Sequence, residues 1–323
     1  MRPLPFLSAA DVERVLTPRL CIEAVEDAFR QLAQGGIPAP GILGLHAGDG
    51  SFHVKAGVLT ADRPYFAAKV NANFSGNPRL GLPTIQGIVY LCDATNGAPL
   101  AVMDSGSITA LRTAAGSAVA ARHLASGNCD TALICGCGAQ AMAQVRALQT
   151  VRQPKRWLAF DTAPAKAIAF AAAAGAELGI VVESVTDMAH AVSESRIIVT
   201  CTTAQRFFLT REMVQPGTFI AAVGADSESK QEIDPRLLAA AKVVTDLTAQ
   251  AATIGDLHHA IASGVMTRDD VHAELGEVVA DLKLGRIDDE EVTVFDSTGT
   301  GLQDVAAAIA AYRYYTITAR RAA

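Results

Sequence analysis

The sequence predicts an α/β protein with two domains: an antiparallel α+β domain at the start, then a Rossmann-type, doubly wound parallel sheet. Three observations lead to this expectation. The chain has 323 residues, enough for about two domains. From Thr131 onward, short apolar runs alternate with helical stretches, which is typical of parallel strands buried on both faces. A Gly-x-Gly turn at Gly136 and Gly138 joins the first of these strands to a helix.

The composition excludes several classes of protein. Half of the residues are hydrophobic and 19% are charged, which excludes a disordered chain. With 27 Lys and Arg against 33 Asp and Glu, the net charge is −6, so a nucleic-acid partner is not expected. No signal peptide is predicted, because the first residues, Met-Arg-Pro-Leu-Pro, do not begin an apolar stretch followed by a small-residue cleavage site. No membrane span is predicted either, because the longest apolar region, residues 165–182, contains Lys166 and Glu177. We expect a cytoplasmic protein with reduced cysteines and no membrane partner.

The first part of the chain predicts a helix followed by an antiparallel sheet. Residues 18–34 carry apolar side chains at three- and four-residue steps, which is the pattern of an amphipathic helix. Three strands are then expected, over residues 51–58, 65–72 and 85–92. Asn96-Gly97 lies between two apolar runs and predicts a hairpin turn, because both residues tolerate positive φ. A long helix over residues 107–124 is expected to follow.

The second part predicts a parallel sheet with helices between its strands. The expected strands are apolar runs at residues 132–135, 157–160, 197–200, 219–223, 243–245 and 292–295. Helices are expected over residues 163–178 and 235–241, and a last helix, over residues 303–321, could pack on either domain. We assign residues 1–115 and 303–323 to the first domain and residues 116–302 to the second.

The turn after the first parallel strand has the pattern of a dinucleotide-binding loop. Gly136 permits a tight turn, Gly138 lets the backbone approach a pyrophosphate, and Ala141 allows the helix to lie close to the strand. Ala139 and Gln140 lead into that helix, whose N-terminus offers unpaired N–H groups to an anion. The alternative interpretation is a tight strand–helix turn without a ligand.

Asp161 ends the second parallel strand and indicates which dinucleotide would bind. It lies 25 positions beyond Gly136, near the spacing of about 20 expected for an acid that holds a ribose 2′-hydroxyl. A carboxylate at this position repels a 2′-phosphate, so we predict NAD as the cofactor, with NADP as the alternative.

No metal site is predicted. Cys135 and Cys137 flank a glycine of the loop, but they have no second cysteine pair or nearby histidine to complete a zinc site. His258, His259 and His272 are expected in a surface helical region without a fixed acidic or cysteine partner.

Several short motifs follow one another in a fixed order over nearly the whole chain: Ala68-Lys69-Val70, Gly76-Asn77-Pro78, Gly81-Leu82-Pro83-Thr84, Leu100–Asp104 and Thr109–Thr113 with Ala120–Leu124, then the Gly136 loop, Gly224-Ala225-Asp226 with Lys230 and Glu232, and Gly301-Leu302-Gln303-Asp304. In these motifs and their order the chain resembles the ornithine cyclodeaminase/μ-crystallin family. The resemblance implies a homodimer in which the α+β domain binds substrate and forms the dimer. It also implies hydride transfer between a nicotinamide and the α-carbon of an amino or imino acid.

The resemblance also implies roles for individual residues. Lys69 would face the carboxylate or imine of the substrate, Arg112 would anchor a carboxylate, and Asp226 would be the catalytic acid. Cofactor contacts are implied at five further positions: Thr84, Thr113, Thr202, Val223 and Ser297.

General chemistry supports these residue types. The planar fork of an arginine holds a carboxylate bidentately, and a nearby acid favours the protonated imine that accepts hydride. The alternatives are a Lys69 in solvent, an exposed Arg112 and an Asp226 that belongs to a charged turn. The apolar residues beside Lys69 favour its burial, which would require a carboxylate partner.

Two departures from the family pattern concern substrate binding. Many members carry an arginine in a Pro-Pro-Arg segment near the start, whereas this chain has Pro38-Ala39-Pro40. Where many members read Met-Pro-Ala, this chain has Lys55-Ala56-Gly57, and we expect Lys55, pointing inward from its strand, to replace the missing cation. His53 stands where ornithine-using members tend to have an acidic residue, so it is a candidate substrate contact that argues against recognition of a terminal amine.

The residues and the resemblance together predict a reductase that uses NADH to convert a small, cyclic imino acid, such as pyrroline-2-carboxylate or piperideine-2-carboxylate, to the L-amino acid. One alternative is an ornithine cyclodeaminase, which converts ornithine to proline and ammonia with no net change in NAD. The other is a binding protein without turnover, as in the μ-crystallin branch.

Overall fold

The computed structural model describes residues 3–322 and divides the chain into two compact units. Unit 1 comprises the chain up to Thr113 and from Thr300 onward, and unit 2 runs from Ala114 to Gly299. The boundaries assigned from the sequence lie two and three residues further along the chain. Among the described residues, none of the helices is both long enough and apolar enough to cross a membrane.

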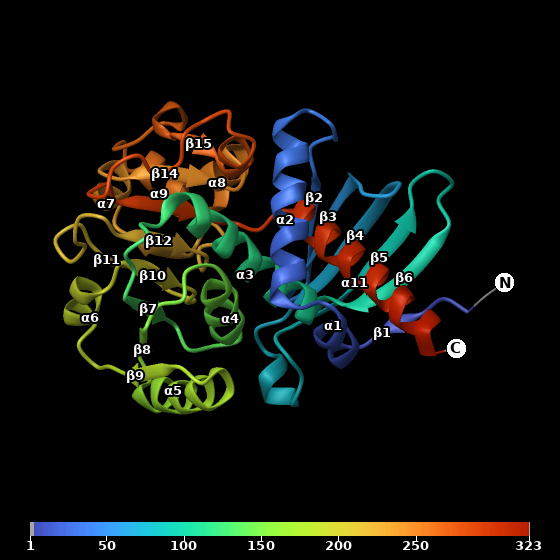
Figure 1. The fold of residues 1–323 in the computed structure, drawn as a ribbon, viewed down its shortest axis with the longest axis horizontal. Helices are drawn as coiled ribbons and strands as arrows, with labels where there is room; N and C mark the ends of the chain where they lie inside the picture. Colours follow the sequence, from blue (N-terminus) through green and yellow to red (C-terminus); the bar gives the residue numbers. More distant parts are fainter. Residues whose placement is uncertain (1–2, 323) are drawn as a thin grey trace. The chain divides into compact units, whose positions relative to one another are not determined.

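Unit 1 is built on a six-stranded sheet in the order β1-β6-β5-β4-β3-β2 (Figure 1). The neighbouring strands are antiparallel, except that β1 runs parallel to β6. The strands are β1 (Phe6–Leu7), β2 (Gly41–Ala47), β3 (Gly50–Thr60), β4 (Pro64–Asn73), β5 (Ile85–Asp93) and β6 (Pro99–Asp104). The three predicted strands and the predicted hairpin are confirmed as β3, β4 and the β5–β6 pair. Strand β2 was not predicted, because its two glycines weaken the strand pattern and its position depends on pairing with β3.

Helices α11 (Gly301–Ala322) and α1 (Ala9–Val15) pack on the strands of this sheet. The other helical segments of unit 1 are α2 (Pro18–Ala33), which packs on α11, the first part of α3 (Ser105–Leu124), and the short 3₁₀ helix η1 (Asn77–Leu80), which has no buried residue. The last helix, α11, packs on β3, β4 and β5 and on α2 (Figure 1), so it belongs with the first domain. Large buried side chains such as Tyr65, Leu91 and Met103 lie beneath the helices.

The opposite face of the same sheet is apolar and exposed. Strand register places a set of large apolar side chains on it, each between 36% and 62% exposed: Phe6, Leu43, Leu45, Phe52, Val70 and Ile88. We call this set the apolar sheet face. Exposed apolar patches of this kind mark interaction surfaces.

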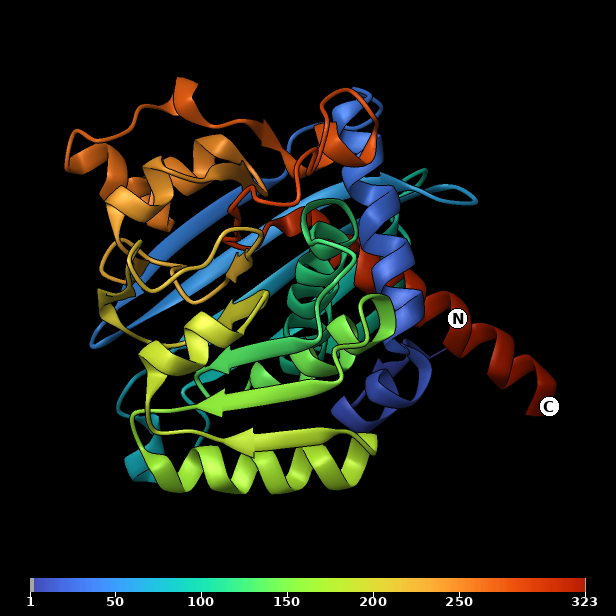
Figure 2. The ribbon, with the colours of Figure 1, turned by 60° about the vertical axis from the view of Figure 1, so that its left-hand side comes forward.

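Unit 2 is built on an eight-stranded, all-parallel sheet in the order β15-β14-β16-β12-β10-β7-β8-β9. Its strands are β7 (Thr131–Cys135), β8 (Arg156–Phe160), β9 (Val181–Ser184), β10 (Ile197–Thr200), β12 (Phe219–Ala222), β14 (Lys242–Thr245), β15 (Ala273–Glu274) and β16 (Thr293–Asp296). Figure 2 shows β7, β8 and β9 running in the same direction, with α5 (Pro164–Leu178) along β9. All six predicted strands are confirmed. The two that were not predicted, β9 and β15, are short edge strands.

The remaining elements of unit 2 connect these strands. They are α4 (Ala141–Val151), α6 (Met188–Glu194), α7 (Pro235–Ala239), α8 (Thr248–Ile254), α9 (Asp256–Ala262), α10 (Leu275–Val279), the 3₁₀ helix η2 (Arg268–Asp270) and a small parallel pair, β11 (Gln205–Leu209) with β13 (Gln231–Ile233). Fully buried strand residues such as Leu133, Ile198 and Ile220 form the centre of the core.

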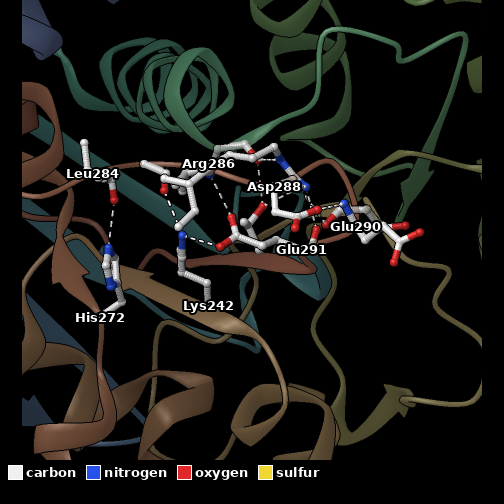
Figure 3. A network of polar contacts seen from close by, with 12 residues as sticks. Lys242, His272, Leu284, Arg286, Asp288, Glu290 and Glu291 are labelled. Carbon is white, nitrogen blue, oxygen red and sulfur yellow. Dashed lines mark hydrogen bonds and ion pairs between the residues drawn. The ribbon is translucent and has the colours of Figure 1, made fainter.

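A polar network fixes the irregular segment between α10 and β16 (Figure 3). The Arg286 guanidinium donates to the carbonyl oxygens of Leu124, at the end of α3, and Glu291. Lys242 lies 2.6 Å from a Glu291 carboxylate oxygen, and its Nζ donates to the carbonyl of Gly285. This segment therefore gains through side chains the hydrogen bonds that regular structure would otherwise supply.

Candidate active site

Unit 1 contains a buried cluster of two cations around one carboxylate. Lys69 is 4% exposed on the helix-covered face of β4, and Asp304 is 1% exposed in the first turn of α11. Lys69 Nζ lies 2.8 Å from each oxygen of the Asp304 carboxylate, and Arg112 Nε donates to Oδ1 over 2.8 Å. The expectation that a buried Lys69 needs a carboxylate partner is confirmed, and Asp304 is that partner.

Local packing explains how Asp304 reaches Lys69. Helix α11 begins at Gly301, where an added Cβ would lie only 3.0 Å from the Ala56 backbone of β3, so glycine permits this close approach. Gln303 Oε1 accepts the backbone N–H of Thr300 at 2.8 Å and an N–H of Arg112 at 3.4 Å. The start of α11 and the Arg112 side chain are thus fixed together.

The cluster shifts the proton affinity of both partners of the ion pair. Burial, together with the charges of Arg112 and Lys55, lowers the pKa of Lys69 to about 7, although Asp304 opposes this shift. Burial alone would raise the pKa of Asp304, but the charges of Lys69 and Arg112 outweigh it and hold that pKa below its usual value. A lysine that titrates near neutral pH can bind an anion and exchange a proton in the same site.

The two substrate candidates on β3 lie on the same sheet face as this cluster. Lys55 is the cross-strand partner of Lys69, and His53 is the partner of Asn71. Lys55 is half-buried and lies close enough to contribute to the lowered pKa of Lys69. His53 is exposed, with its Nε2 2.9 Å from the Ser51 hydroxyl oxygen.

The two predicted cofactor contacts in unit 1 lie in different surroundings. Thr113 is buried in α3, and its hydroxyl donates to the carbonyl of Thr109 over 2.7 Å. Thr109 in turn accepts a hydrogen bond from Lys69 over 3.3 Å. Thr84 is half-buried just before β5, and its carbonyl accepts the N–H of Phe74.

In unit 2 the loop from β7 to α4 has the geometry that a dinucleotide pyrophosphate needs. Gly136 has φ +96°, and a Cβ there would lie 2.9 Å from the Cys201 carbonyl oxygen, so only glycine fits. Gly138 faces open space, which leaves room for a ligand beside its backbone. Ala139 is exposed next to it, and Gln140 carries a buried Oε1 without a hydrogen-bond partner. The residues present therefore fit a bound dinucleotide.

Asp161 lies against this loop, as the spacing predicts. One carboxylate oxygen accepts the N–H of Cys137 at 3.0 Å, and the other accepts the N–H of Ala163 at 2.9 Å. The half-buried carboxylate thus sits between the end of β8 and the glycine turn, where it would meet a ribose rather than a 2′-phosphate.

The other predicted residues of unit 2 follow three adjacent strands. Thr202 follows β10, Val223 and Asp226 follow β12, and Ser297 follows β16, so all four lie at the carboxyl edge of the sheet. Val223 and Ser297 are buried, and the Ser297 hydroxyl has no hydrogen-bond partner. Asp226 is exposed within unit 2 and pairs with Lys230 at 2.6 Å.

The fold and the two sets of side chains define a class: a two-unit α/β protein with a dinucleotide loop in one unit and a buried carboxylate-and-cation cluster in the other. The model of the ornithine cyclodeaminase/mu-crystallin family matches residues 4–316, and the chain belongs to this family.

Three solved structures show how close the resemblance is. An archaeal alanine dehydrogenase, a dimer with bound NAD, has a TM-score of 0.92 and 36% identity, covering 98% of this chain and 97% of its own. The Δ1-pyrroline-2-carboxylate reductase of Thermococcus litoralis, in complex with NADH and L-proline, has a TM-score of 0.92 and 32% identity over 98% of each chain. The iminosuccinate reductase of Paracoccus denitrificans, in complex with NAD⁺, has a TM-score of 0.92 and 33% identity, also over 98% of each chain.

Two residues central to these clusters were not assigned a role from the sequence. Asp304 and Glu232 each stood only in a motif shared with the family, without a role of their own. The structure shows Asp304 as the shared anion of the cationic cluster and Glu232 as a fully buried carboxylate that accepts four hydrogen bonds. A signal for Asp304 exists in the sequence, since a buried Lys69 requires an acid somewhere in the same domain.

Proposed function

We propose that this protein is an NAD-dependent oxidoreductase that reduces a small α-imino acid to the L-amino acid. A cyclic imino acid, such as pyrroline-2-carboxylate or piperideine-2-carboxylate, is the expected substrate. The single observation that carries the proposal is the buried cluster of Lys69, Arg112 and Asp304 in a chain that also has a complete dinucleotide loop. The similarity to two imino-acid reductases over 98% of the chain supports it.

The proposed roles follow from charge and geometry. The substrate carries a fixed carboxylate, which the Arg112 guanidinium and protonated Lys69 would bind, while Asp304 holds both cations in place. Lys55, on the same sheet face, would supply the cation that many family members have in an early arginine.

The reaction also needs a proton on the imine nitrogen. Asp226 is the proposed acid that provides it, so that the nitrogen gains one proton while the α-carbon gains one hydride. Bound NADH would supply the hydride and leave as NAD⁺. Gly136, Gly138, Ala139, Gln140 and Asp161 would hold the dinucleotide, with further contacts from the remaining predicted positions, Thr84, Thr113, Thr202, Val223 and Ser297.

A substrate panel tests the proposal against its two alternatives. We expect NADH to be consumed with a cyclic imino acid and an L-amino acid to accumulate in equal amount. Ammonia release from ornithine without net NADH consumption would identify a cyclodeaminase instead. Ligand binding without turnover of any imino or amino acid would identify a binding protein.

We also propose that the protein is a homodimer formed through the apolar sheet face. This face presents large exposed apolar side chains, and the similar archaeal alanine dehydrogenase is a dimer. In sedimentation experiments we expect a dimer for the wild type, a monomer for Ile88→Glu, and a dimer for the control Ile168→Glu, whose side chain is exposed on α5. A monomeric wild type would contradict the proposal.

We propose a cytoplasmic location because all six cysteines are free thiols, which suits a reducing compartment.

A further inference from the structure

Glu232, on the short strand β13, joins two loops at the carboxyl edge of the unit 2 sheet. Its side chain is fully buried. Oε1 accepts the N–H and the hydroxyl of Thr202, each at 2.7 Å. Oε2 accepts the hydroxyl of Thr200 at 2.7 Å and the N–H of Gly224 at 2.8 Å. One carboxylate therefore connects the end of β10 with the loop that follows β12.

The surrounding structure is built for this contact. A Cβ at Gly224 would overlap the Glu232 carboxylate, so glycine is required for the loop to come this close. The backbone N–H groups of Glu232 and Ile233 both donate to Asp256 Oδ1, at 2.8 and 2.9 Å. The position of Glu232 is thus fixed from its backbone as well as from its side chain.

The two joined loops carry residues to which the proposed function gives roles. Thr202 and Val223 are proposed cofactor contacts, and Asp226, the proposed acid, lies two residues beyond Gly224. Glu232 itself has no exposed surface with which to contact a ligand. Its influence on the reaction can only pass through the loops.

We propose that Glu232 is a positioning residue that sets the spacing between the Thr202 loop and the Gly224 loop, and thereby the affinity for NADH and the placement of Asp226. This inference rests on the proposed function. A carboxylate suits the task because each of its oxygens accepts one backbone N–H and one hydroxyl at the same time. A glutamine cannot do this, since its amide nitrogen would face the N–H of either Thr202 or Gly224.

The test compares three variants of the full-length protein. Glu232→Gln releases one loop, Thr200→Val removes only one hydroxyl donor, and Asp234→Ala removes the N-cap of α7 two residues along the chain. NADH binding is measured directly by energy transfer from Trp157, the one tryptophan of the chain, to the bound coenzyme. Kinetic constants and the melting temperature are measured alongside.

For Glu232→Gln we expect the Kd for NADH to rise about tenfold and kcat to fall, while the KM for the imino acid stays within about threefold. The KM for the imino acid should change little because the cations proposed to bind the substrate, Lys69 and Arg112, belong to unit 1, whereas Glu232 belongs to unit 2. Thr200→Val should also raise the Kd for NADH, but by a smaller factor. Asp234→Ala should lower the melting temperature and leave the Kd for NADH unchanged.

Unchanged NADH affinity and kcat in a folded Glu232→Gln protein would overturn the inference. If that variant does not fold, unchanged NADH affinity in Thr200→Val would overturn it. The inference would also be overturned if Asp234→Ala raised the Kd for NADH as much as Glu232→Gln, because the effect would then come from a general loss of stability. A wild type that binds NADH but reduces no imino acid would refute the proposed function and leave the binding comparison to decide on Glu232.

Discussion

Replacing Asp304 by asparagine tests the cationic cluster most sharply. Asp304→Asn keeps the shape of the side chain and removes the anion that Lys69 and Arg112 share, at 2.8 Å from each. Removing one partner of a buried ion pair typically costs about 3–5 kcal/mol, because a charge is left uncompensated. Lys69 can respond by losing its proton, since its pKa is already about 7, whereas Arg112 stays charged.

The loss of stability should therefore come mainly from the uncompensated charge of Arg112. We expect the unfolding free energy to fall by about 3 kcal/mol, near the lower end of that range. Urea unfolding followed by circular dichroism measures it. Arg313→Gln is the control, because it removes an exposed ion pair with Asp62 from the same helix and should change little.

The same variant should change the pH dependence of catalysis. Protonated Lys69 is the form that binds a carboxylate, so kcat/KM in the wild type should fall as the pH rises through about 7. Without the Asp304 charge the pKa of Lys69 drops further, and the fall should begin at lower pH. An unfolding free energy and a pH profile both equal to those of the wild type would refute the role of Asp304.

Three further outcomes are expected. Because the pKa of Lys69 is lowered from 10.5 to about 7, its burial costs stability below that pH, and the stability lost is regained as the pH rises from about 7 to 10.5. Lys69→Met should remove this rise in urea unfolding experiments, and an identical slope in both proteins would exclude Lys69 as its source. Asp161→Ala should raise the KM for NADH far more than the KM for NADPH in steady-state assays, and an unchanged ratio would remove Asp161 from the ribose site. Lys55→Ala should raise the KM for the imino acid about tenfold with kcat nearly constant, and an unchanged KM would show that Lys55 does not replace the missing arginine.

The sequence was most informative where local chemistry decides the structure. The strands of unit 2 are buried on both faces, so each appears as a short apolar run that needs no knowledge of its neighbours. The turn at Gly136 and the position of Asp161 were predictable for the same reason, because a strand, a glycine turn and a helix follow each other directly. Helix α2 was predictable from its apolar periodicity.

Contacts between distant segments were not predictable from the same patterns. Asp304 is 235 residues from Lys69, and only the packing of α11 on β3 and β4 brings them together. In the sequence Glu232 is one of several charged residues in a polar segment. Its burial depends on the loops that follow β10 and β12, which the sequence near Glu232 does not reveal. Strand β2 exists through its pairing with β3 rather than through its own sequence pattern.

The most direct test of the proposed function is the stoichiometry of one reaction. Purified protein is mixed with NADH and pyrroline-2-carboxylate or piperideine-2-carboxylate, and the coenzyme and the amino acid are measured together. One molecule of L-amino acid formed for each NADH oxidised is the predicted result. No NADH oxidation with either imino acid, by a protein shown to bind NADH, would contradict it.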